Sequence, residues 1–161
     1  MLAAGEGRRI GGPKALLRIG AQTFLERSVE RLARPGVAEI VAVVGHQAER
    51  VAGAVRLPAG ARLVENTRHA EGMLGSILSG LAAAEESGAE GVLLHLVDHP
   101  LVETASVDRV IAALEAGAVV VVPSHEGRRG HPAGFARAAW PALRAASPER
   151  GARALLADHP D

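Results

Sequence analysis

The chain has 161 residues, with eighteen lysines and arginines against eighteen aspartates and glutamates, so it fits one domain and lacks the positive excess that holds nucleic acid. It has three aromatic residues and no cysteine, which argues against base-stacking platforms and excludes disulfides and thiolate chemistry. No apolar run approaches the roughly 20 residues of a membrane span and no signal peptide is evident, so we expect a cytoplasmic protein without a membrane anchor.

The first motif is a glycine-rich segment from Leu2 to Leu17, LAAGEGRRIGGPKALL. Its glycines let successive backbone amides converge on phosphate oxygens, while two arginines and Lys14 supply positive charge. It is not a P-loop, because no GlyLysSer or GlyLysThr follows, and Ile10 stands where a dinucleotide fingerprint has glycine. The segment predicts an anion-binding loop; the alternative is an ordinary glycine-rich turn with solvated cations.

After this loop the chain alternates between helical and strand patterns. The helical stretches carry their apolar residues on one face, and the strand stretches are short β-branched runs typical of strands buried on both faces. The alternation predicts βαβ units and therefore an α/β fold, a single three-layer domain over residues 1–161 with a mostly parallel sheet. In chain order, we predict a helix over Gln22–Arg34, a strand over Val37–Gly45, a weaker strand over Arg62–Glu65, a helix over Met73–Glu86, a strand over Gly91–Val97, a helix over Ala105–Ala116 with Thr104 or Ser106 as its N-cap, and a strand over Ala118–Val122.

A carboxylate follows the strand that we expect to be central. Ligands of such sheets bind beyond the carboxyl ends of the strands, and Asp98 lies at this position in LeuValAspHisPro. One or two carboxylates are enough to bind Mg²⁺ when the ion also contacts substrate phosphates. Asp98 is therefore a candidate Mg²⁺ ligand; the alternatives are a helix N-cap or a turn residue before Pro100.

Two later loops also carry candidate binding groups. Asn66 to Gly80 leads through two glycines into a helix with Ser76 in its first turn, where amides and a hydroxyl suit a phosphate, a ribose or a base; a plain helix-entry turn is the alternative. Ser124 to Gly134, SHEGRRGHPAG, predicts a hairpin or a flap over the strand ends. Its cations and His131 suit a second anionic substrate, although an exposed charged turn fits as well.

The histidines raise the question of a transition-metal site. His95, Asp98 and His99 are close in sequence, but alternation along a strand points His95 and Asp98 to opposite faces. We therefore expect no convergent metal triad there. Four others are expected to be separate loop residues: His46, His69, His125 and His159.

The two ends of the pattern look short. A phosphate-binding loop normally follows a strand, yet only Met1 and Leu2 precede this one. At the other end the chain runs from a short helix near Ala152 to Asp161. We expect the fold to lack its first strand and a C-terminal segment.

Four motifs in this order, LAAGEGRRIGGPKALL, ValAspHisPro, GlyMetLeuGlySerIle and GlyArgArgGlyHisPro, resemble the MobA-like NTP transferases, and within that family the molybdenum cofactor cytidylyltransferases. The resemblance implies a Rossmann-like fold of the nucleotide-diphospho-sugar-transferase type. It also implies that Arg9 and Lys14 contact the NTP triphosphate and that Asp98 binds Mg²⁺, with Arg9, Lys14 and Asp98 as the catalytic residues.

The resemblance further implies how the substrates are recognised. LeuAlaAlaGly rather than LeuAlaGlyGly accompanies cytosine in the family, which favours CTP. The implied nucleotide-binding residues are Leu2, Ala3, Ala4, Gly5, Gly7, Lys14, Asn66, Gly72, Met73 and Ser76. The implied residues facing the pterin acceptor are Arg128, Arg129, Gly130, His131, Pro132 and Arg153.

The implied reaction is transfer of CMP from CTP to the terminal phosphate of the molybdopterin cofactor, with release of pyrophosphate and with a molybdoenzyme or its chaperone as partner. The alternatives are a transferase of the same fold that uses GTP or a sugar-phosphate acceptor, and a non-catalytic nucleotide-binding module. A nicotinamide dehydrogenase is a further alternative because Glu26 lies at a suitable distance after the loop to bind a ribose, but Lys14 and Ile10 argue against it.

Overall fold

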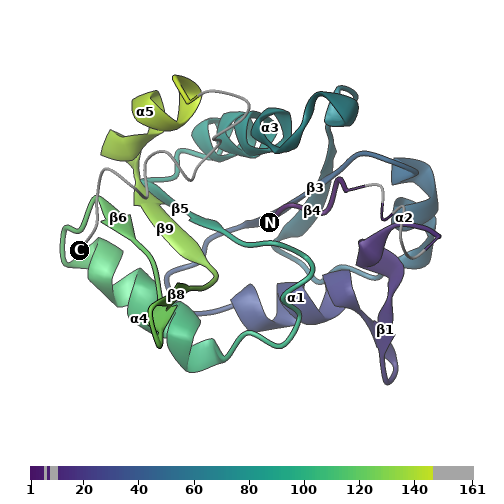
Figure 1. The fold of residues 1–161 in the computed structure, drawn as a ribbon, viewed down its shortest axis with the longest axis horizontal. Coiled ribbons are helices and arrows are strands. Elements are labelled where there is room, and N and C mark those ends of the chain that lie inside the picture. The colour runs from purple at the N-terminus through teal and green to yellow at the C-terminus, as the bar shows by residue number, and fades with distance from the viewer. Residues whose placement is uncertain (6, 8–10, 147–161) are drawn as a thin grey trace.

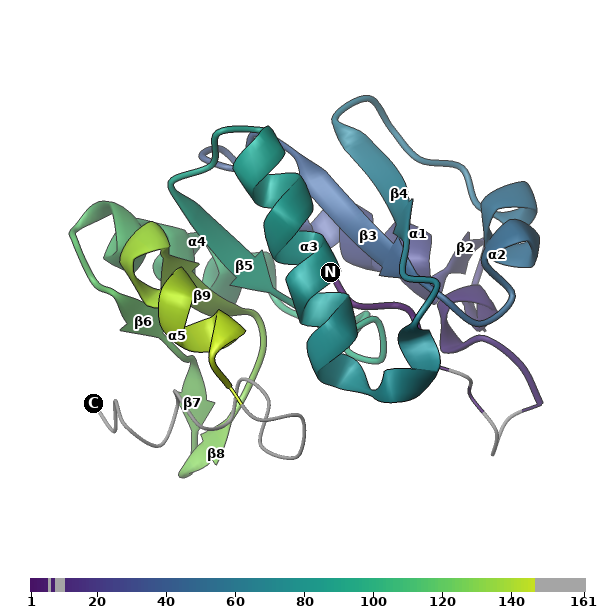
Figure 2. The ribbon, with the colours of Figure 1, turned by 90° about the horizontal axis from the view of Figure 1, so that it is seen from above.

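The computed structural model describes residues 1–5, 7 and 11–146, and it has three layers (Figure 1). Helices α3 and α5 cover one face of the sheet, and α1 and α4 cover the other; Figure 2 shows α3 lying across β3 and β5. The helices are α1 (Phe24–Leu32), α2 (Ala48–Ala54), α3 (Met73–Glu86), α4 (Thr104–Glu115) and α5 (Trp140–Arg144), with 3₁₀ turns at Lys14–Leu16, His69–Glu71 and Arg137–Ala139. The strands are β1 (Arg18–Ile19), β2 (Gln22–Thr23), β3 (Ile40–Val44), β4 (Ala61–Glu65), β5 (Gly91–Leu94), β6 (Val120–Val121), β7 (Ser124–His125), β8 (Arg128–Arg129) and β9 (Ala133–Ala136).

The first residues of the chain connect two groups of strands. β3 pairs with β4 in parallel, while β9 lies between β5 and β6 and is antiparallel to both. Leu2 forms parallel bridges with Val43 of β3 and with Leu96 just after β5. The order across the molecule is therefore β4, β3, the residues around Leu2, β5, β9 and β6, which confirms the predicted three-layer α/β architecture.

Side-chain alternation shows that the chain around Leu2 runs as a strand. Met1 and Ala3 belong to one hydrophobic cluster with α1 and Val107 of α4, whereas Leu2 belongs to another with Ile77 of α3 and the α5 region. Successive side chains of an extended segment point to opposite faces of a sheet. This short segment thus places its residues in both layers of the core, directly before the glycine-rich loop.

Most predicted elements are present, with differences at their ends and in one strand. The helix predicted over 73–86 and the Ser124–Gly134 hairpin are confirmed, the latter as β7 and β8. β1, β2, β9 and α2 were not predicted, and the helix predicted over Gln22–Arg34 begins only at Phe24, because Gln22 and Thr23 pair as β2 with β1. The strand predicted over 118–122 is the shorter β6, which pairs with the antiparallel β9. The predicted N-cap of α4 is wrong: Glu103 takes this position without a side-chain hydrogen bond, because Thr104 already lies within the helix.

A capping box fixes the start of α1. The Thr23 hydroxyl accepts a hydrogen bond from the Glu26 amide (3.1 Å), and the Glu26 carboxylate accepts one from the Thr23 amide (2.7 Å). The other carboxylate oxygen of Glu26 accepts a hydrogen bond from the Arg56 amide at 2.9 Å. Glu26 therefore caps a helix, and the ribose-binding role considered for it has no support in the structure.

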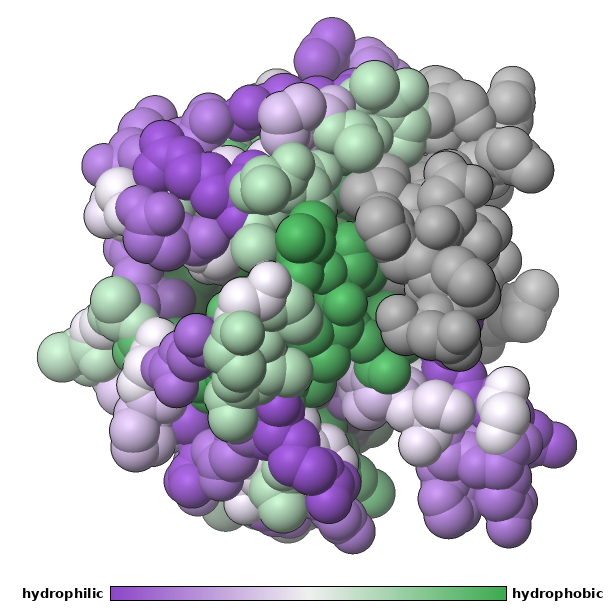
Figure 3. Space-filling view, turned by 90° about the vertical axis from the view of Figure 1, so that its left-hand side faces the viewer, coloured by the Kyte–Doolittle hydropathy of each residue, from purple (hydrophilic) through white to green (hydrophobic). Residues whose placement is uncertain are grey.

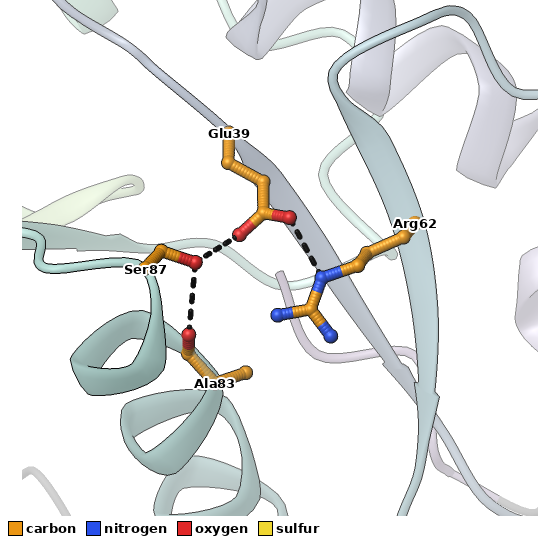
Figure 4. A network of polar contacts seen from close by, with 4 residues as sticks. All are labelled: Glu39, Arg62, Ala83 and Ser87. Carbon is orange, nitrogen blue, oxygen red and sulfur yellow. Dashed lines mark hydrogen bonds and ion pairs between the residues drawn. The ribbon is translucent and has the colours of Figure 1, made fainter.

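A polar network ties the amino-terminal end of β3 to its neighbours (Figure 4). Arg62 of β4 donates to Glu39 at 2.7 Å, and the Ser87 hydroxyl, at the end of α3, donates to the other Glu39 oxygen at 2.6 Å. The same hydroxyl lies 3.1 Å from the Ala83 carbonyl oxygen. This network lies at the end of the sheet opposite the loops that carry the candidate binding groups.

The molecular surface also has an apolar side. Figure 3 shows the face on which β6 lies, where hydrophobic residues gather beside hydrophilic ones. Val119, next to this edge strand, is among the exposed large hydrophobic residues. Among the described residues, no helix is both long and apolar enough to cross a membrane.

Candidate functional site

The opening loop starts from a well-anchored backbone. The Leu2 amide donates to the His95 carbonyl and the Ala3 amide to the Val43 carbonyl, both at 2.8 Å. Gly5 follows Ala4, and a Cβ added at Gly5 would meet no atom of the other described residues within 4 Å. Gly7 and Gly11 have positive φ angles of 60° and 74°, which glycine adopts without strain. Arg9 lies outside the described residues.

Lys14 reaches the strand-end carboxylate, which joins the first two candidate motifs. Pro13 and Ala15 on either side of Lys14 are buried, so they fix this turn against the core while the lysine side chain points outward. The Lys14 Nζ atom donates to the Asp98 Oδ2 atom at 2.8 Å across a separation of 84 residues. The two side chains are 44% and 38% exposed, so the pair remains accessible to a ligand.

Asp98 is electrostatically prepared to carry a negative charge. Partial burial raises the pKa of its carboxyl group. The hydrogen bond from Lys14 and the nearby positive charges lower the pKa by more than burial raises it, so the pKa lies below its ordinary value. The other Asp98 oxygen lies 3.7 Å from His99 Nε2. An ionised, partly exposed carboxylate at a strand end fits the oxygen donor that Mg²⁺ prefers. The described part of the chain holds no group of three or more His, Asp or Glu side chains arranged to bind a metal ion.

The turn before α3 is shaped by an internal hydrogen bond. The buried Asn66 side chain donates to the Ser76 hydroxyl at 3.1 Å and accepts from the Arg68 amide at 3.0 Å. Gly72 has a φ of 107°, and Met73 after it is 55% exposed. Asn66 and Ser76 therefore hold the turn, while Gly72 and Met73 are the members of the predicted nucleotide set that face outward from it.

Gly45 is a residue of this region that the sequence reasoning missed. It follows β3, and a Cβ added there would lie 2.4 Å from His69 Cβ and 3.0 Å from Ala4 Cβ. Three loops, after Leu2, after β3 and after β4, therefore meet at a point where only glycine fits. The sequence signal was a glycine directly after a buried strand, which does not by itself reveal what approaches it.

Three histidines lie together beside Asp98. The ring centroid of His99 is 4.7 Å from that of His131, and His95 lies 6.4 and 6.1 Å from them. His95 is fully buried, burial lowers its pKa to about 3, and neither ring nitrogen has a hydrogen-bond partner among the described residues. Burial also lowers the pKa of His131, whose Nδ1 lies 3.3 Å from the Leu94 carbonyl oxygen. Both rings are thus neutral at pH 7.

The structure brings part of the predicted acceptor set to this site. His131 lies beside His99, and Pro132 after it is buried. The Gly130 amide donates to the Pro123 carbonyl at 2.7 Å, which closes the hairpin. Arg128 and Arg129 are exposed on β8 of that hairpin. Arg153 lies outside the described residues.

Comparisons with known proteins agree on one family. The model of the MobA-like NTP transferase domain matches residues 1–161. Nicotine blue oxidoreductase of Paenarthrobacter nicotinovorans is 34% identical over 99% of this chain and 81% of its own length. Molybdenum cofactor guanylyltransferase of Cereibacter sphaeroides is 35% identical over 83% of this chain and 64% of its own length, so the chain spans less than two thirds of that relative.

Solved structures give the same result for the fold. Rv0371c from Mycobacterium tuberculosis H37Rv superposes with a TM-score of 0.80 and 28% identity, covering 96% of this chain and 78% of the other. A structure of the same protein in complex with manganese gives a TM-score of 0.75 with the same identity and coverage. The fold is therefore the Rossmann-like fold of the nucleotidyltransferases.

Proposed function

The chain belongs to the MobA-like NTP transferase family and is a nucleotidyltransferase, and from this premise we propose that it transfers CMP from CTP to the terminal phosphate of the molybdopterin cofactor. The observation that carries the proposal is the Lys14–Asp98 pair, which joins the glycine-rich loop to the end of the central strand at 2.8 Å. The relative named as a molybdenum cofactor guanylyltransferase supports the acceptor class. A recipient molybdoenzyme or its chaperone is the partner that this product implies.

Lys14 and Asp98 suit the two charges of a metal-bound triphosphate. The Lys14 ammonium neutralises phosphate oxygens, and the Asp98 carboxylate is an oxygen ligand for Mg²⁺. The manganese complex of the related mycobacterial protein supports a divalent cation in this fold. When bound, the ion supplies charge neutralisation on the phosphate oxygens. In the structure the charges of Lys14 and Asp98 neutralise each other. On substrate binding, Lys14 would exchange Asp98 for phosphate oxygens, and Asp98 would exchange Lys14 for the divalent cation.

The reaction requires positioning more than proton transfer. One oxygen of the acceptor's terminal phosphate forms a bond to the α-phosphorus of CTP. The bond from this phosphorus to the bridging oxygen of the β-phosphate breaks, and pyrophosphate leaves with that electron pair. The attacking phosphate is already ionised near neutral pH, so no general base is needed. Catalysis therefore depends on alignment and on the charges of Lys14 and Arg9.

We assign the two substrates to different loops around the pair. The nucleotide side consists of the backbone from Ala3 to Gly7 and the turn at Gly72 and Met73. The acceptor side consists of His131, whose ring lies beside that of His99, and of the exposed cations of β8, which precede His131 in the chain. CTP is preferred over GTP in this proposal because Ala3 and Ala4 form the LeuAlaAlaGly opening.

A second candidate function is favoured by one observation. The relative with the longest match among those described above is named an oxidoreductase. The structure offers no ribose carboxylate at Glu26, since both of its oxygens accept backbone hydrogen bonds. Equilibrium dialysis with NADH, NADPH, FAD and CTP separates the oxidoreductase from the transferase. An oxidoreductase binds one of the redox cofactors in preference to CTP, whereas the transferase binds CTP.

The test is pyrophosphate release with Mg²⁺ and each of CTP, GTP, ATP and UTP, with and without molybdopterin cofactor. We expect release that depends on CTP and on the cofactor. Asp98→Asn should lower the rate by about 10²-fold or more, as for other charge-stabilising groups. Asp108→Asn is the matched control. Like Asp98, Asp108 is a partly exposed carboxylate that accepts a hydrogen bond from a cationic side chain, here Arg34 at 2.7 Å, and it is 44% exposed. This variant should keep the full rate.

Each other outcome changes the conclusion in a defined way. Preference for GTP, or release with a sugar phosphate, retains the transferase and replaces the substrate. CTP binding without release by any acceptor favours the non-catalytic nucleotide-binding module. An Asp98→Asn variant as active as Asp108→Asn removes Asp98 from the site.

A further inference from the structure

The residue directly before α2 has a backbone conformation that side chains rarely adopt. Gln47 has φ 55° and ψ 40°, in the left-handed region, and of the residues that the structure describes only Glu126 shares a positive φ without being glycine. The Gln47 carbonyl accepts a hydrogen bond from the Val51 amide at 3.0 Å, and Val51 is fully buried. The turn is therefore anchored to the core through α2, and conformations of this kind are concentrated at binding sites.

The Gln47 side chain connects two neighbouring side chains. Its Oε1 atom accepts a hydrogen bond from Arg50 Nη1 at 2.8 Å, and its Nε2 atom lies 3.1 Å from His46 Nε2. The His46 ring lies edge-on to the His69 ring, with 6.0 Å between the two centroids. These contacts hold the guanidinium of an exposed arginine in one place, so less side-chain freedom is lost when it binds a ligand.

The Arg50 guanidinium lies against the end of the glycine-rich loop. Its Nη1 atom is 3.7 Å from the position of a Cβ added at Gly12, and apart from the chain neighbours of Gly12 no other described residue has an atom within 4 Å of that position. Gly12 precedes Lys14 by two residues, with the buried Pro13 between them. A guanidinium has five N–H donors that match the oxygens of a phosphate, and the bond to Gln47 uses one of them. Arg50 therefore brings a cation from another element to the segment that carries Lys14.

The two cations belong to different parts of the fold. Lys14 is paired with Asp98, which follows β5, whereas Arg50 belongs to α2, which follows β3. Figures 1 and 2 both show α2 at one side of the molecule and β8, whose cations we assign to the acceptor, toward the other side. In the reaction proposed above, the α-phosphorus meets the acceptor, so the β- and γ-phosphates extend away from the acceptor groups. Arg50 is thus the cation on the side of these two outer phosphates.

We propose that Arg50, positioned by Gln47, binds the β- and γ-phosphates of the NTP, the part that leaves as pyrophosphate. This inference rests on the proposed function, because it requires an NTP at the glycine-rich loop. When the bond from the α-phosphorus to the bridging oxygen breaks, the electron pair and its negative charge go to pyrophosphate. A guanidinium at the pyrophosphate oxygens stabilises this charge through charge-assisted hydrogen bonds. Arg50 therefore serves every NTP alike and leaves the choice of base to other residues.

The alternative is that the contact between Arg50 and Gln47 only stabilises the exposed surface of α2. Another arginine has the same local arrangement elsewhere in the fold. Arg109 of α4 is exposed and donates to the Ser106 hydroxyl, three residues earlier in the helix, at 3.1 Å. It lines a shallow hollow beside Val121 of β6. Arg109 is therefore a matched control for the loss of an exposed helical arginine with a partner three residues before it.

The experiment measures binding of pyrophosphate, CTP and CMP to the full chain, each with Mg²⁺, by isothermal titration calorimetry. Arg50→Gln removes the positive charge, whereas Arg50→Lys keeps the charge without the planar fork. Gln47→Leu removes the hydrogen bonds of the Gln47 side chain and keeps its approximate size. Arg109→Gln is the control. Thermal unfolding without ligand shows whether each variant keeps the stability of the parent chain, as expected for exposed side chains.

We expect Arg50→Gln to weaken the binding of pyrophosphate and of CTP by about 10- to 100-fold, the loss typical of hydrogen bonds to a charged group, and to leave CMP binding unchanged. Arg50→Lys should weaken both by less. Gln47→Leu should weaken both by roughly 3- to 10-fold, and it should cause no further loss when it is combined with Arg50→Gln, because Gln47 acts through Arg50. Arg109→Gln should match the parent chain.

Equal pyrophosphate binding by the Arg50→Gln and Arg109→Gln variants overturns the proposal, and so does a parent chain that binds no pyrophosphate. An equal loss of CMP and pyrophosphate binding removes Arg50 from the outer phosphates, and an additive effect of Gln47→Leu removes Gln47 as the positioning residue. Pyrophosphate carries no base and needs no acceptor, so these results hold whichever NTP the chain uses. A chain that transfers CMP as proposed, but binds pyrophosphate independently of Arg50, keeps the proposed function and loses only this inference.

Discussion

Gly45→Ala tests whether the loops after Leu2, after β3 and after β4 meet as closely as the structure shows. The added Cβ would lie 2.4 Å from His69 Cβ, 2.7 Å from His69 Cγ and 3.0 Å from Ala4 Cβ. Real Cβ atoms do not approach other atoms below 3.0 Å, so the backbone of one loop has to move. Overpacking of this kind costs about 1 to 3 kcal/mol, which for a chain of this size lowers the melting temperature by roughly 2 to 12 °C.

A matched substitution separates this contact from the general effect of removing a glycine. Gly53 lies in α2, and a Cβ there would meet nothing within 4 Å. Gly53→Ala should therefore leave stability unchanged or raise it by up to about 1 kcal/mol, since alanine favours a helix. Thermal unfolding of both variants gives the comparison, and pyrophosphate release reports whether the displaced Ala4 loop also impairs transfer.

The contact partner can be removed in turn. His69→Gly deletes the Cβ that Gly45→Ala would touch, so the double variant should regain about 1 kcal/mol or more relative to the sum of the two single changes. A Gly45→Ala chain as stable as Gly53→Ala refutes the close approach. A strictly additive double variant assigns the loss to some contact other than His69.

Two further predictions concern stability. Thr23→Ala removes the hydroxyl that caps α1 and should cost about 1 kcal/mol, seen as a lower urea midpoint, whereas Thr23→Ser should retain the cap and match the parent chain. For pH, the unfolded chain keeps the proton of the Met1 amino group up to its ordinary pKa of 8.0, while burial lowers the folded pKa to about 5. The unfolded state thus binds more protons between these values, so the free energy of unfolding rises from pH 5 to pH 8, by an amount on the order of 4 kcal/mol. Urea titrations of the free and the N-acetylated chain at pH 5.5 and 8 check this, and an equal pH dependence in both would contradict it.

Much of the architecture could be predicted because its signals are local. The run before Gly45 gave a buried strand at β3, and the amphipathic segment from Met73 gave α3 with the observed bounds. β9 could not be found in this way, since AlaGlyPheAla carries no strand periodicity. It is a strand because Phe135 and its neighbours fit between β5 and β6, which is a tertiary effect.

The sequence by itself determined the order of the longer strands and helices, the glycine-rich loop, and Lys14 and Asp98 as separate candidates, because hydrophobic period and turn chemistry act over a few residues. The tertiary structure alone decided that Lys14 pairs with Asp98 and that His131 lies beside His99. It also decided that Leu2 bridges β3 and the chain just after β5. These contacts join residues far apart in the chain, and their geometry follows from how the two helical layers pack on the sheet, which no local pattern encodes.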